Sequence, residues 1–409
     1  MIKLILKNLL TIFFYPLKFI IPKGSIIILS TNSPYLYSGN TRYLHEYLLK
    51  NIKGDIFWHT ESGVIKKYFI DEGINYISTS KPFHYVWILL RAKIVINDGD
   101  AYINSFSIID NKFTVKINTG HGSNAKFALY NFKNIISVKE QMSRLQKFDC
   151  INLASPCLIN SFVELYAVAR KRVVSYGYPR CDQFFDRKLI DKRYLKKNLA
   201  KSFDNNIDAN TRIIMYTPTW RPYQYNLPIL DLPNFHSLKF NDWLEKNNYY
   251  FFYTVHSGNK PKVYLENSSR IQYIDKDKFP LFDINSLMME SDILLNDYSA
   301  TTTDYSILNK AQLFCMPDYD YYWGHKNMKF MKDNESEQLL MNYKKSIPGA
   351  EVKDYKSLIN KLAYIIDNYD AYLYEYKNET NNILLKYYDT TKTNACLTFK
   401  KFIEKSLTR

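Results

Sequence analysis

FDINSLMMESDILLNDYSATTTDYSILNKAQLFCMPDYDYYW, residues 282–323, is the stretch that decides the fold. Within it an apolar run at residues 293–295 is followed by a polar turn, a helical segment at 304–309 and a second apolar run at 312–316. A strand, a turn, a helix and another strand in this order form the unit from which parallel sheets are built. The pattern predicts an α/β fold, with the turn at the carboxyl end of its strand.

The turn carries a carboxylate and several hydroxyl groups, contributed by Asp297, Ser299, Thr301, Thr302 and Thr303. Open α/β sheets bind ligands beyond the carboxyl ends of their strands, and N–H groups at a helix start favour an anion. Hydroxyl groups add donors for phosphate oxygens. The turn therefore predicts a phosphate or nucleotide site, and ordinary helix capping by Asp and Ser is the alternative.

Length and composition limit the class of protein. The chain has 409 residues, which is too many for one core and suits two domains. The net charge of +15 suits nucleic acid, an anionic membrane or phosphate-bearing substrates, and does not choose among them. The five cysteines form no C-x-x-C pair, which argues against a disulfide framework or a zinc ribbon and favours a reducing compartment.

The first 21 residues are strongly apolar, but Lys3, Lys7, Pro16 and Lys18 interrupt them. No small-residue cleavage site follows, so a secretory signal is not expected. Residues 1–24 are predicted to associate with a membrane, as an in-plane helix or hairpin on the inner leaflet with the lysines toward lipid phosphates. The alternative is a first core helix flanked by lysines.

Strand and helix patterns alternate along most of the remaining chain. In the first half, strands are expected at residues 25–30, 55–59, 74–78, 93–97 and 113–118, and helices at 41–50 and 87–92. A basic, turn-rich stretch follows. In the second half, strands are expected at residues 212–216, 249–255 and 271–274, and helices at 352–367 and 369–387. This spacing predicts parallel sheets with helices on both faces. The predicted domains are 25–186 and 211–385, joined by a linker at 187–210 and followed by a basic helix within 386–409.

A glycine-flanked histidine follows the strand expected at 113–118. The segment reads Gly120-His121-Gly122-Ser123, and Lys126 comes about one helical turn later. Glycines allow the backbone to approach a ligand closely, and histidine is the side chain best suited to act as a base near neutral pH. The segment predicts a catalytic histidine with a nearby anion site; the alternative is a glycine-rich turn with an incidental histidine.

Two strand ends in the second half carry basic side chains. Thr219 and Arg221 follow the strand at 212–216, where an arginine can clamp a phosphate with two hydrogen bonds. His256 follows the strand at 249–255 and so repeats the arrangement of His121. The two histidines, one in each domain, can face each other across a cleft. A surface arginine and a core histidine are the alternatives.

The segment Asp98-Gly99-Asp100 resembles a metal-binding D-x-D pattern. A turn at the end of a strand explains the same residues equally well. No metal site and no cofactor are predicted.

Four motifs in order resemble those of the CDP-glycerol glycerophosphotransferases, the family of teichoic acid primases and polymerases and related capsule enzymes. The motifs are residues 120–123 with Lys126, residues 177–180 with Asp182, residues 216–221, and residues 297–299 with Asp304. Their order and spacing agree over roughly residues 26–362.

The resemblance implies a GT-B architecture, in which two Rossmann-like domains with parallel sheets face a central cleft. It implies transfer of glycerol phosphate or ribitol phosphate from a CDP-activated donor to a hydroxyl of a lipid-linked or polymer acceptor, with release of CMP, in teichoic acid or capsular polysaccharide synthesis. It also implies peripheral attachment to the cytoplasmic face of the membrane, and no nucleic-acid partner is predicted.

The hypothetical mechanism gives each of these residues a role. His121 deprotonates the acceptor, while His256, Arg221, Thr219, Asp297 and the 299–303 turn hold the donor's diphosphate. The acceptor or its phosphate is positioned by Gly120, Gly122, Ser123, Lys126 and Arg180.

Two other functions are compatible with the sequence. A GT-B glycosyltransferase that uses a nucleotide sugar has the same fold and the same phosphate site. A basic membrane- or nucleic-acid-binding protein without catalysis explains the charge but leaves the histidines and the four motifs unexplained.

Overall fold

The computed structural model describes residues 16–99, 113–122, 139, 142–185, 207, 210–256, 260–324, 346–389 and 394–408. Of these, residues 16–122, 139–182 and 394–408 belong to one compact unit and residues 183–389 to a second. Within the described ranges, no helix combines the length and the apolar character needed to cross a bilayer. The predicted linker lies outside the described residues except for 207 and 210, as do residues 1–15 of the predicted membrane segment.

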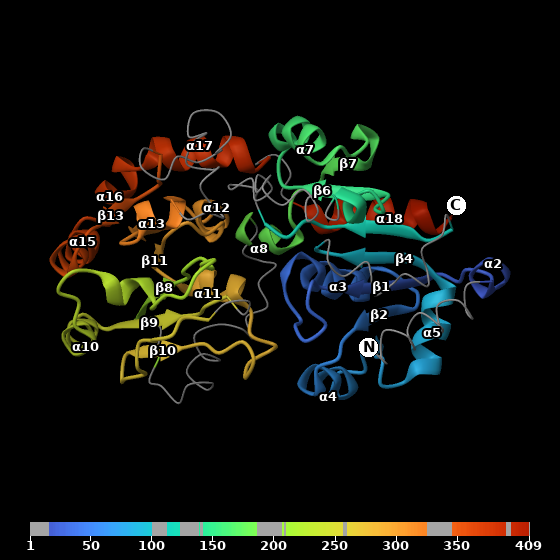
Figure 1. Ribbon diagram of the computed structural model, residues 1–409, viewed down its shortest axis with the longest axis horizontal. Helices are drawn as coiled ribbons and strands as arrows, with labels where there is room; N and C mark the ends of the chain where they lie inside the picture. Colours follow the sequence, from blue (N-terminus) through green and yellow to red (C-terminus); the bar gives the residue numbers. More distant parts are fainter. Residues whose placement is uncertain are drawn as a thin grey trace. The chain divides into compact units, whose positions relative to one another are not determined.

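The first unit contains a seven-stranded parallel sheet with the order β3-β2-β1-β4-β5-β6-β7 (Figure 1). Its strands are β1 (Ile26–Ser30), β2 (Ile56–His59), β3 (Tyr76–Ile77), β4 (Ala92–Asn97), β5 (Val115–Asn118), β6 (Cys150–Leu153) and β7 (Val173–Ser175). All five residues of β1 are buried, because both faces of a parallel sheet are covered by helices. The predicted alternation of strand and helix is confirmed here.

Helices surround the first sheet. They are α2 (Leu17–Ile20), α3 (Gly39–Asn51), α4 (Gly63–Asp71), α5 (Pro82–Arg91), α7 (Ile159–Tyr166) and α18 (Ala395–Leu407), with single 3-10 turns η2 (Pro156–Leu158), η3 (Arg170–Arg172) and η4 (Pro179–Cys181). The last helix of the chain, α18, contacts α3 and β4 (red in Figure 1). The basic helix expected within 386–409 is therefore part of the first unit rather than a separate segment.

Asp182 holds the start of α18 in place. Its Oδ1 accepts a hydrogen bond from the Ala395 N–H at 2.7 Å, and its Oδ2 accepts one from the Cys396 N–H at 2.8 Å. Burial raises the pKa of the Asp182 carboxyl to about 6, although both amides oppose the shift. The aspartate of the 177–182 motif thus joins two parts of the chain that are more than 200 residues apart.

The second unit contains a six-stranded parallel sheet with the order β10-β9-β8-β11-β12-β13. Its strands are β8 (Arg212–Tyr216), β9 (Tyr249–Tyr253), β10 (Ile271–Tyr273), β11 (Ile293–Asn296), β12 (Ala311–Cys315) and β13 (Ala350–Val352). Its helices are α10 (Ser237–Lys246), α11 (Ile284–Glu290), α12 (Thr301–Ser306), α13 (Tyr319–Gly324), α15 (Tyr355–Asp367), α16 (Tyr369–Glu375) and α17 (Lys377–Tyr387), with the 3-10 turn η7 (Pro228–Asp231). The short helix α8 (Asp182–Phe185) lies where the chain passes from the first unit to the second.

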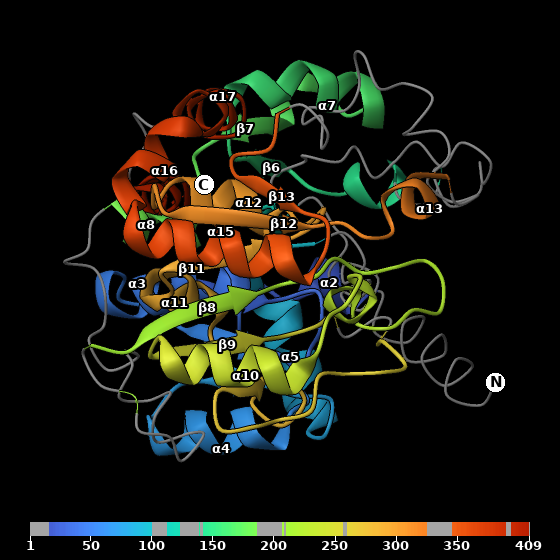
Figure 2. The same ribbon diagram turned by 90° about the vertical axis from the view of Figure 1, so that its left-hand side faces the viewer.

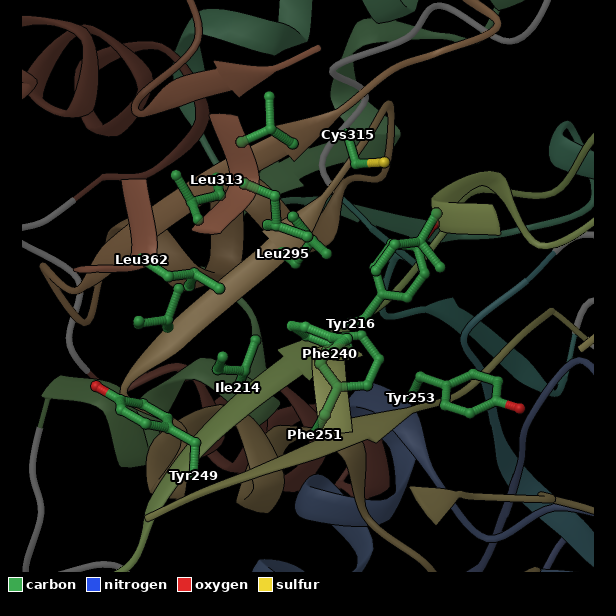
Figure 3. Packing of buried hydrophobic residues seen from close by; sticks show 14 of the residues in the cluster. Ile214, Tyr216, Phe240, Tyr249, Phe251, Tyr253, Leu295, Leu313, Cys315 and Leu362 are labelled. Carbon is green, nitrogen blue, oxygen red and sulfur yellow. The ribbon is translucent and has the colours of Figure 1, made fainter. Parts of the chain in front are cut away.

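Apolar side chains cover both faces of the second sheet. On one face α10 and α15 lie over the strands (Figure 2), and Phe240 of α10 packs against Phe251 with ring centroids 5.2 Å apart (Figure 3). The alternate strand residues Phe252, Leu294 and Phe314 are also fully buried. Sheets buried on both faces place only their strand ends within reach of a ligand.

The strand order reverses once in each sheet, between β1 and β4 in the first unit and between β8 and β11 in the second. Open α/β sheets bind ligands at such a switch point, beyond the carboxyl ends of the strands. We call the loops that follow β1, β4, β5, β6 and β7 the first-unit edge, and the loops that follow β8, β9, β11 and β12 the second-unit edge. These two edges contain the described residues that the sequence predicted to be functional.

Some predicted element boundaries are wrong. Helix α12 begins at Thr301 rather than at 304, so the three threonines form its first turn instead of the loop before it. Helix α5 begins at Pro82, where proline suits the first helical position, rather than at 87. Val352 ends the short strand β13 and does not begin a helix, whereas β8 has the predicted bounds.

Candidate active site

Three buried asparagines build the first-unit edge. Asn97 ends β4, Asn118 ends β5 and Asn152 lies in β6, and each is no more than 5% exposed. The Asn97 side-chain amide donates to Ser30 Oγ at 2.8 Å, and that of Asn152 donates to the Gly177 carbonyl at 2.8 Å. These bonds link the end of β4 to β1 and link β6 to the loop that follows β7, so the edge is braced by side chains that do not face solvent.

Gly120 allows the backbone to turn directly after β5. Its φ is +76°, and a Cβ at this position would lie 2.8 Å from the Asn152 carbonyl oxygen and 2.8 Å from Tyr178 Cε1. Only glycine fits such a left-handed, crowded position. Asn40 in α3 donates to the Gly120 carbonyl at 2.7 Å. The turn brings out His121, whose side chain is 68% exposed.

Arg180 and Tyr178 hold the same turn from the other side. Arg180 Nη1 donates to the His121 carbonyl at 2.8 Å, and the Tyr178 hydroxyl donates to the Gly122 carbonyl at 2.6 Å. The Arg180 guanidinium also lies 4.7 Å from the centre of the Tyr178 ring. Arg180 is only 7% exposed, so the geometry supports a role in positioning the His121 backbone. Ser123 and Lys126, the other predicted members of this site, lie outside the described residues.

A buried arginine organises the second-unit edge. Arg221 is 0% exposed, and its Nη1 donates to Asp297 Oδ2 at 2.6 Å. Its Nε and Nη2 bind both oxygens of Asp318 at 2.8 and 3.0 Å. The guanidinium thereby joins the loops that follow β8, β11 and β12. The predicted phosphate clamp would need a guanidinium that faces solvent, and the geometry supports a bracing role instead.

Electrostatics explain why Asp318 in this buried network is ionised. Burial alone would raise the pKa of the Asp318 carboxyl, but the attraction of Arg221 outweighs it, and the pKa lies below its usual value. The rings of Tyr298 and Tyr322 each lie 5.1 Å from the guanidinium. A buried charge is tolerated when it is paired and hydrogen-bonded in this way.

Asp297 is also committed to the protein's own backbone. It is 0% exposed and accepts hydrogen bonds from the Thr219 N–H at 2.8 Å and from the Tyr298 N–H at 2.5 Å. Thr219, predicted to bind the donor, is half-buried and fixed by this contact. Asp297 therefore sets the conformation of the loop on which the hydroxyl-rich turn begins.

The hydroxyl-rich turn divides into buried and accessible members. Thr302 and Thr303 are 0% exposed; the Thr302 hydroxyl accepts from Asn296, and the Thr303 hydroxyl donates to the Ala300 carbonyl at 2.7 Å. Ser299 and Thr301 are only half-buried, and their hydroxyl oxygens are 2.9 Å apart.

The N–H groups of Ser299 and Ala300 have no acceptor among the described residues. The donors open to a ligand are thus these two amides and one of the two hydroxyls, because the other hydroxyl donates across the contact between Ser299 and Thr301.

His256 lies in the loop that follows β9, and its side chain is exposed. Thr254, two residues earlier, donates from its backbone to the Tyr216 carbonyl at 3.2 Å, which ties the loop to β8. His121 belongs to the first unit and His256 to the second. Both histidines therefore follow strand ends, as the sequence predicted.

A cavity of about 490 Å³ opens beside the Arg221 network, a feature that sequence reasoning missed. Tyrosine rings and polar side chains line it, and the Tyr223 hydroxyl donates to Asp318 at 2.6 Å. The lining residues include Tyr223, Tyr225, Asp231, Lys262, Asp318 and Tyr321. Aromatic rings with a few polar groups are typical of small-molecule sites.

The Asp98-Gly99-Asp100 segment contributes one described carboxylate to the first-unit edge. Asp98 is 2% exposed, and Asp100 lies outside the described residues. No group of three or more His, Cys, Asp or Glu side chains in the described part of the chain has the arrangement of a metal site.

Two doubly wound parallel sheets, each with polar loops at its switch point, are the arrangement of the GT-B fold. The solved structure of the wall teichoic acid polymerase TagF has this fold: it superposes with a TM-score of 0.72 at 18% identity, covering 94% of this chain and 90% of that one. At this identity the likeness establishes the fold alone.

The sequence relationship is more specific. The model of the CDP-glycerol:poly(glycerophosphate) glycerophosphotransferase family matches residues 13–397, so the chain belongs to that family and is a transferase of that type. It is 26% identical to the teichoic acid glycerol-phosphate primase of Bacillus subtilis (strain 168), over 76% of each chain. It is also 26% identical to the teichoic acid glycerol-phosphate transferase of Staphylococcus aureus (strain NCTC 8325 / PS 47), over 86% of this chain and 87% of that one.

Proposed function

We propose that this enzyme transfers glycerol phosphate, or ribitol phosphate, from a CDP-activated donor to a hydroxyl of a membrane-linked acceptor in teichoic acid or capsular polysaccharide synthesis. The acceptor oxygen attacks the β-phosphorus of the donor and forms the new P–O bond. The bond from that phosphorus to the bridging oxygen breaks, and CMP leaves. The observation that carries the proposal is the exposed His121 on a braced turn after β5, beside the switch-point strand β4, in a chain of this family.

His121 is the proposed general base, because its imidazole is exposed while its backbone is held at both neighbouring positions. The proton of the acceptor hydroxyl passes to the ring as the P–O bond forms. A positioned base of this kind contributes about 10²–10⁴-fold to the rate. Lys126 and Ser123 are proposed to position the acceptor or its phosphate.

The donor's diphosphate is proposed to bind at Ser299, Ala300 and Thr301. The two open amides and the one open hydroxyl there suit phosphate oxygens, which accept several hydrogen bonds at once. Arg221 and Asp297 act indirectly in this scheme, by fixing the loops on either side. His256 is proposed to stabilise the charge that develops on the departing CMP. Positioning and charge stabilisation account for most of the catalysis of phosphoryl transfer.

Peripheral attachment to the inner face of an anionic membrane is proposed for the first unit. In α5, Phe83, Trp87 and Arg91 lie on one face at four-residue spacing; Phe83 is 87% and Trp87 50% exposed. In α2, Phe19 and Ile20 are 55% and 73% exposed. Exposed aromatic and aliphatic side chains beside basic ones suit the boundary between lipid headgroups and acyl chains.

The segment after α2 is tied to the end of α5, because the Gly24 N–H donates to the Arg91 carbonyl at 2.9 Å. The end of α5, where the Arg91 guanidinium lies over the Trp87 ring, is therefore close to the segment that follows α2. We expect the protein to float with vesicles that contain anionic lipid, and to do so less as salt rises. Equal binding to neutral vesicles at all salt concentrations would contradict the electrostatic part of the proposal.

A donor panel tests the function. The protein is incubated with CDP-glycerol, CDP-ribitol and nucleotide sugars in the presence of lipid-linked acceptors, and release of CMP or another nucleotide is followed. CMP release from a CDP-polyol that depends on the acceptor supports the proposal. Turnover of a nucleotide sugar alone would establish the rival GT-B glycosyltransferase. Salt-sensitive binding of nucleic acid with no donor turnover would favour the non-catalytic alternative.

A further inference from the structure

We infer that Asp98 is a positioning residue that orients the imidazole of His121. The inference rests on the proposed function, in which His121 removes a proton from the acceptor. Asp98 accepts the Nδ1–H of the ring, which leaves Nε2 unprotonated and turned outward. A neutral imidazole carries one proton and takes up another only at the bare nitrogen, so control of the tautomer controls the base.

Asp98 and His121 project from adjacent strand ends. Asp98 follows β4 and His121 follows β5, and these strands pair in parallel up to Asn97 and Asn118. His121 Nδ1 lies 3.9 Å from Asp98 Oδ2. This distance exceeds that of a hydrogen bond, but a rotation of the exposed ring can close it, and the bonds of catalytic groups often tighten only when substrate binds.

The carboxylate is fixed more firmly than the ring it faces. Asp98 is 2% exposed, and its Oδ1 accepts a hydrogen bond from the Asn32 N–H at 2.9 Å. Gly39 approaches the other oxygen: its φ is +71°, and a Cβ there would lie 2.5 Å from Asp98 Oδ2. The Asn97 side chain accepts from the Gly99 N–H at 2.7 Å, which holds the loop on both sides of Asp98. A buried, hydrogen-bonded acceptor beside an exposed ring is suited to select one ring orientation.

The charge of Asp98 needs a partner. A buried carboxylate is costly unless it is paired and hydrogen-bonded. Within the described residues, His121 is the only basic side chain within 4 Å of it. Asp98 Oδ1 accepts from a backbone amide, and Asp98 Oδ2 lies 3.9 Å from the imidazole Nδ1. A role of Asp98 as a loop cap alone explains the hydrogen bond from the Asn32 N–H. It does not explain why the second carboxylate oxygen lies near the imidazole.

The variant Asp98→Asn separates these two contacts. Asparagine keeps an oxygen that can accept from the Asn32 N–H, but it removes the negative charge that faces Nδ1. We expect kcat to fall at least tenfold, and by no more than the roughly 10²–10⁴-fold that the base itself supplies, with KM for the donor unchanged. In the ¹⁵N spectrum of the imidazole at alkaline pH, the wild type should show Nδ1 protonated and Nε2 bare. The variant should show a mixture of both tautomers.

A double variant distinguishes positioning from simple support of the fold. If Asp98 acts through His121, then Asp98→Asn should cost nothing further in a His121→Asn protein, because residues that act as a unit are not additive. A matched control is Asp149→Asn. Asp149 also accepts a backbone N–H, that of Lys116 at 2.9 Å, but at the opposite end of β5. This control should retain the wild-type kcat and the wild-type tautomer.

The outcomes separate the inference from the function on which it rests. If His121→Asn retains full activity, the proposed base is wrong and the inference falls with it. If His121→Asn is inactive while Asp98→Asn keeps the wild-type kcat and tautomer, the inference alone is overturned. An additive loss in the double variant with unchanged tautomers would likewise reduce Asp98 to a structural residue.

Discussion

The predicted base of the first-unit edge and the predicted charged pair of the second-unit edge differ in burial. At the first-unit edge the predicted base is 68% exposed, and its neighbours bind its backbone. At the second-unit edge the predicted residues Arg221 and Asp297, which carry opposite charges, are fully buried and bind each other. A polar residue that follows a strand can thus either contact a ligand or hold neighbouring loops in place. An exposed side chain is available for the first role, and a buried one for the second.

An unpaired buried charge is costly, which explains the pairing at the second-unit edge. Two carboxylates bind the Arg221 guanidinium, and these contacts hold three loops at fixed positions. Such a network contributes little net stability, but removal of one member leaves the other uncompensated. Substitution of Arg221 or Asp297 should therefore lower the stability of the fold. Substitution of His121 should lower the turnover rate.

The largest effect is expected for Asp297→Ala. The substitution leaves the Nη1 side of a fully buried guanidinium without its carboxylate and removes the acceptor for the Thr219 N–H. We expect the free energy of unfolding to fall by about 3–5 kcal/mol, measured by denaturant titration.

Asp277→Ala is the matched control for that experiment. Asp277 forms an exposed ion pair with Lys260 in the same unit, at 2.7 Å, and its loss should cost no more than about 1 kcal/mol. Wild-type stability of Asp297→Ala together with weakened donor binding would contradict the comparison. It would mean that Asp297 contacts the ligand.

A smaller effect is expected for Ser299→Ala, which tests the accessible part of the same edge. Loss of one hydrogen bond to a charged phosphate costs about 1.5 kcal/mol, so KM for the donor should rise roughly tenfold. Stability should hardly change, because Ser299 is only half-buried.

Ser306→Ala provides the opposite case within α12. The Ser306 hydroxyl is 1% exposed and donates to the Thr302 carbonyl at 2.9 Å, so its loss should lower stability and leave KM unchanged. If Ser299→Ala also leaves KM unchanged, the diphosphate does not bind at this turn.

Much of the fold could be predicted from sequence because buried parallel strands are short apolar runs with polar ends. β8 was predicted at its observed bounds, and the GT-B class followed from the family motifs. The short strand β13 was missed, because three residues with one exposed side chain have no distinctive period. The return of α18 to the first unit depends on contacts with residues more than 200 positions earlier, which no local pattern reveals.

The site was harder to predict than the fold, because burial cannot be read from a motif. The residues around Arg221 indicate a strand end, but its carboxylate partners lie 76 and 97 positions away. The asparagine braces did have a sequence signal, since the segments KIVIN and FTVKIN both end in asparagine. An apolar strand that ends in Asn or Asp at a predicted switch point is therefore worth examining as part of a site.

The central claim, that the exposed histidine of the first-unit edge does the chemistry, is tested most directly by His121→Ala. Rates of CMP release from CDP-glycerol with a lipid-linked acceptor should fall by about 10²–10⁴-fold relative to the wild type. The unfolding curves of the two proteins should coincide, because the side chain is 68% exposed. A folded variant that releases CMP at the wild-type rate would contradict the account.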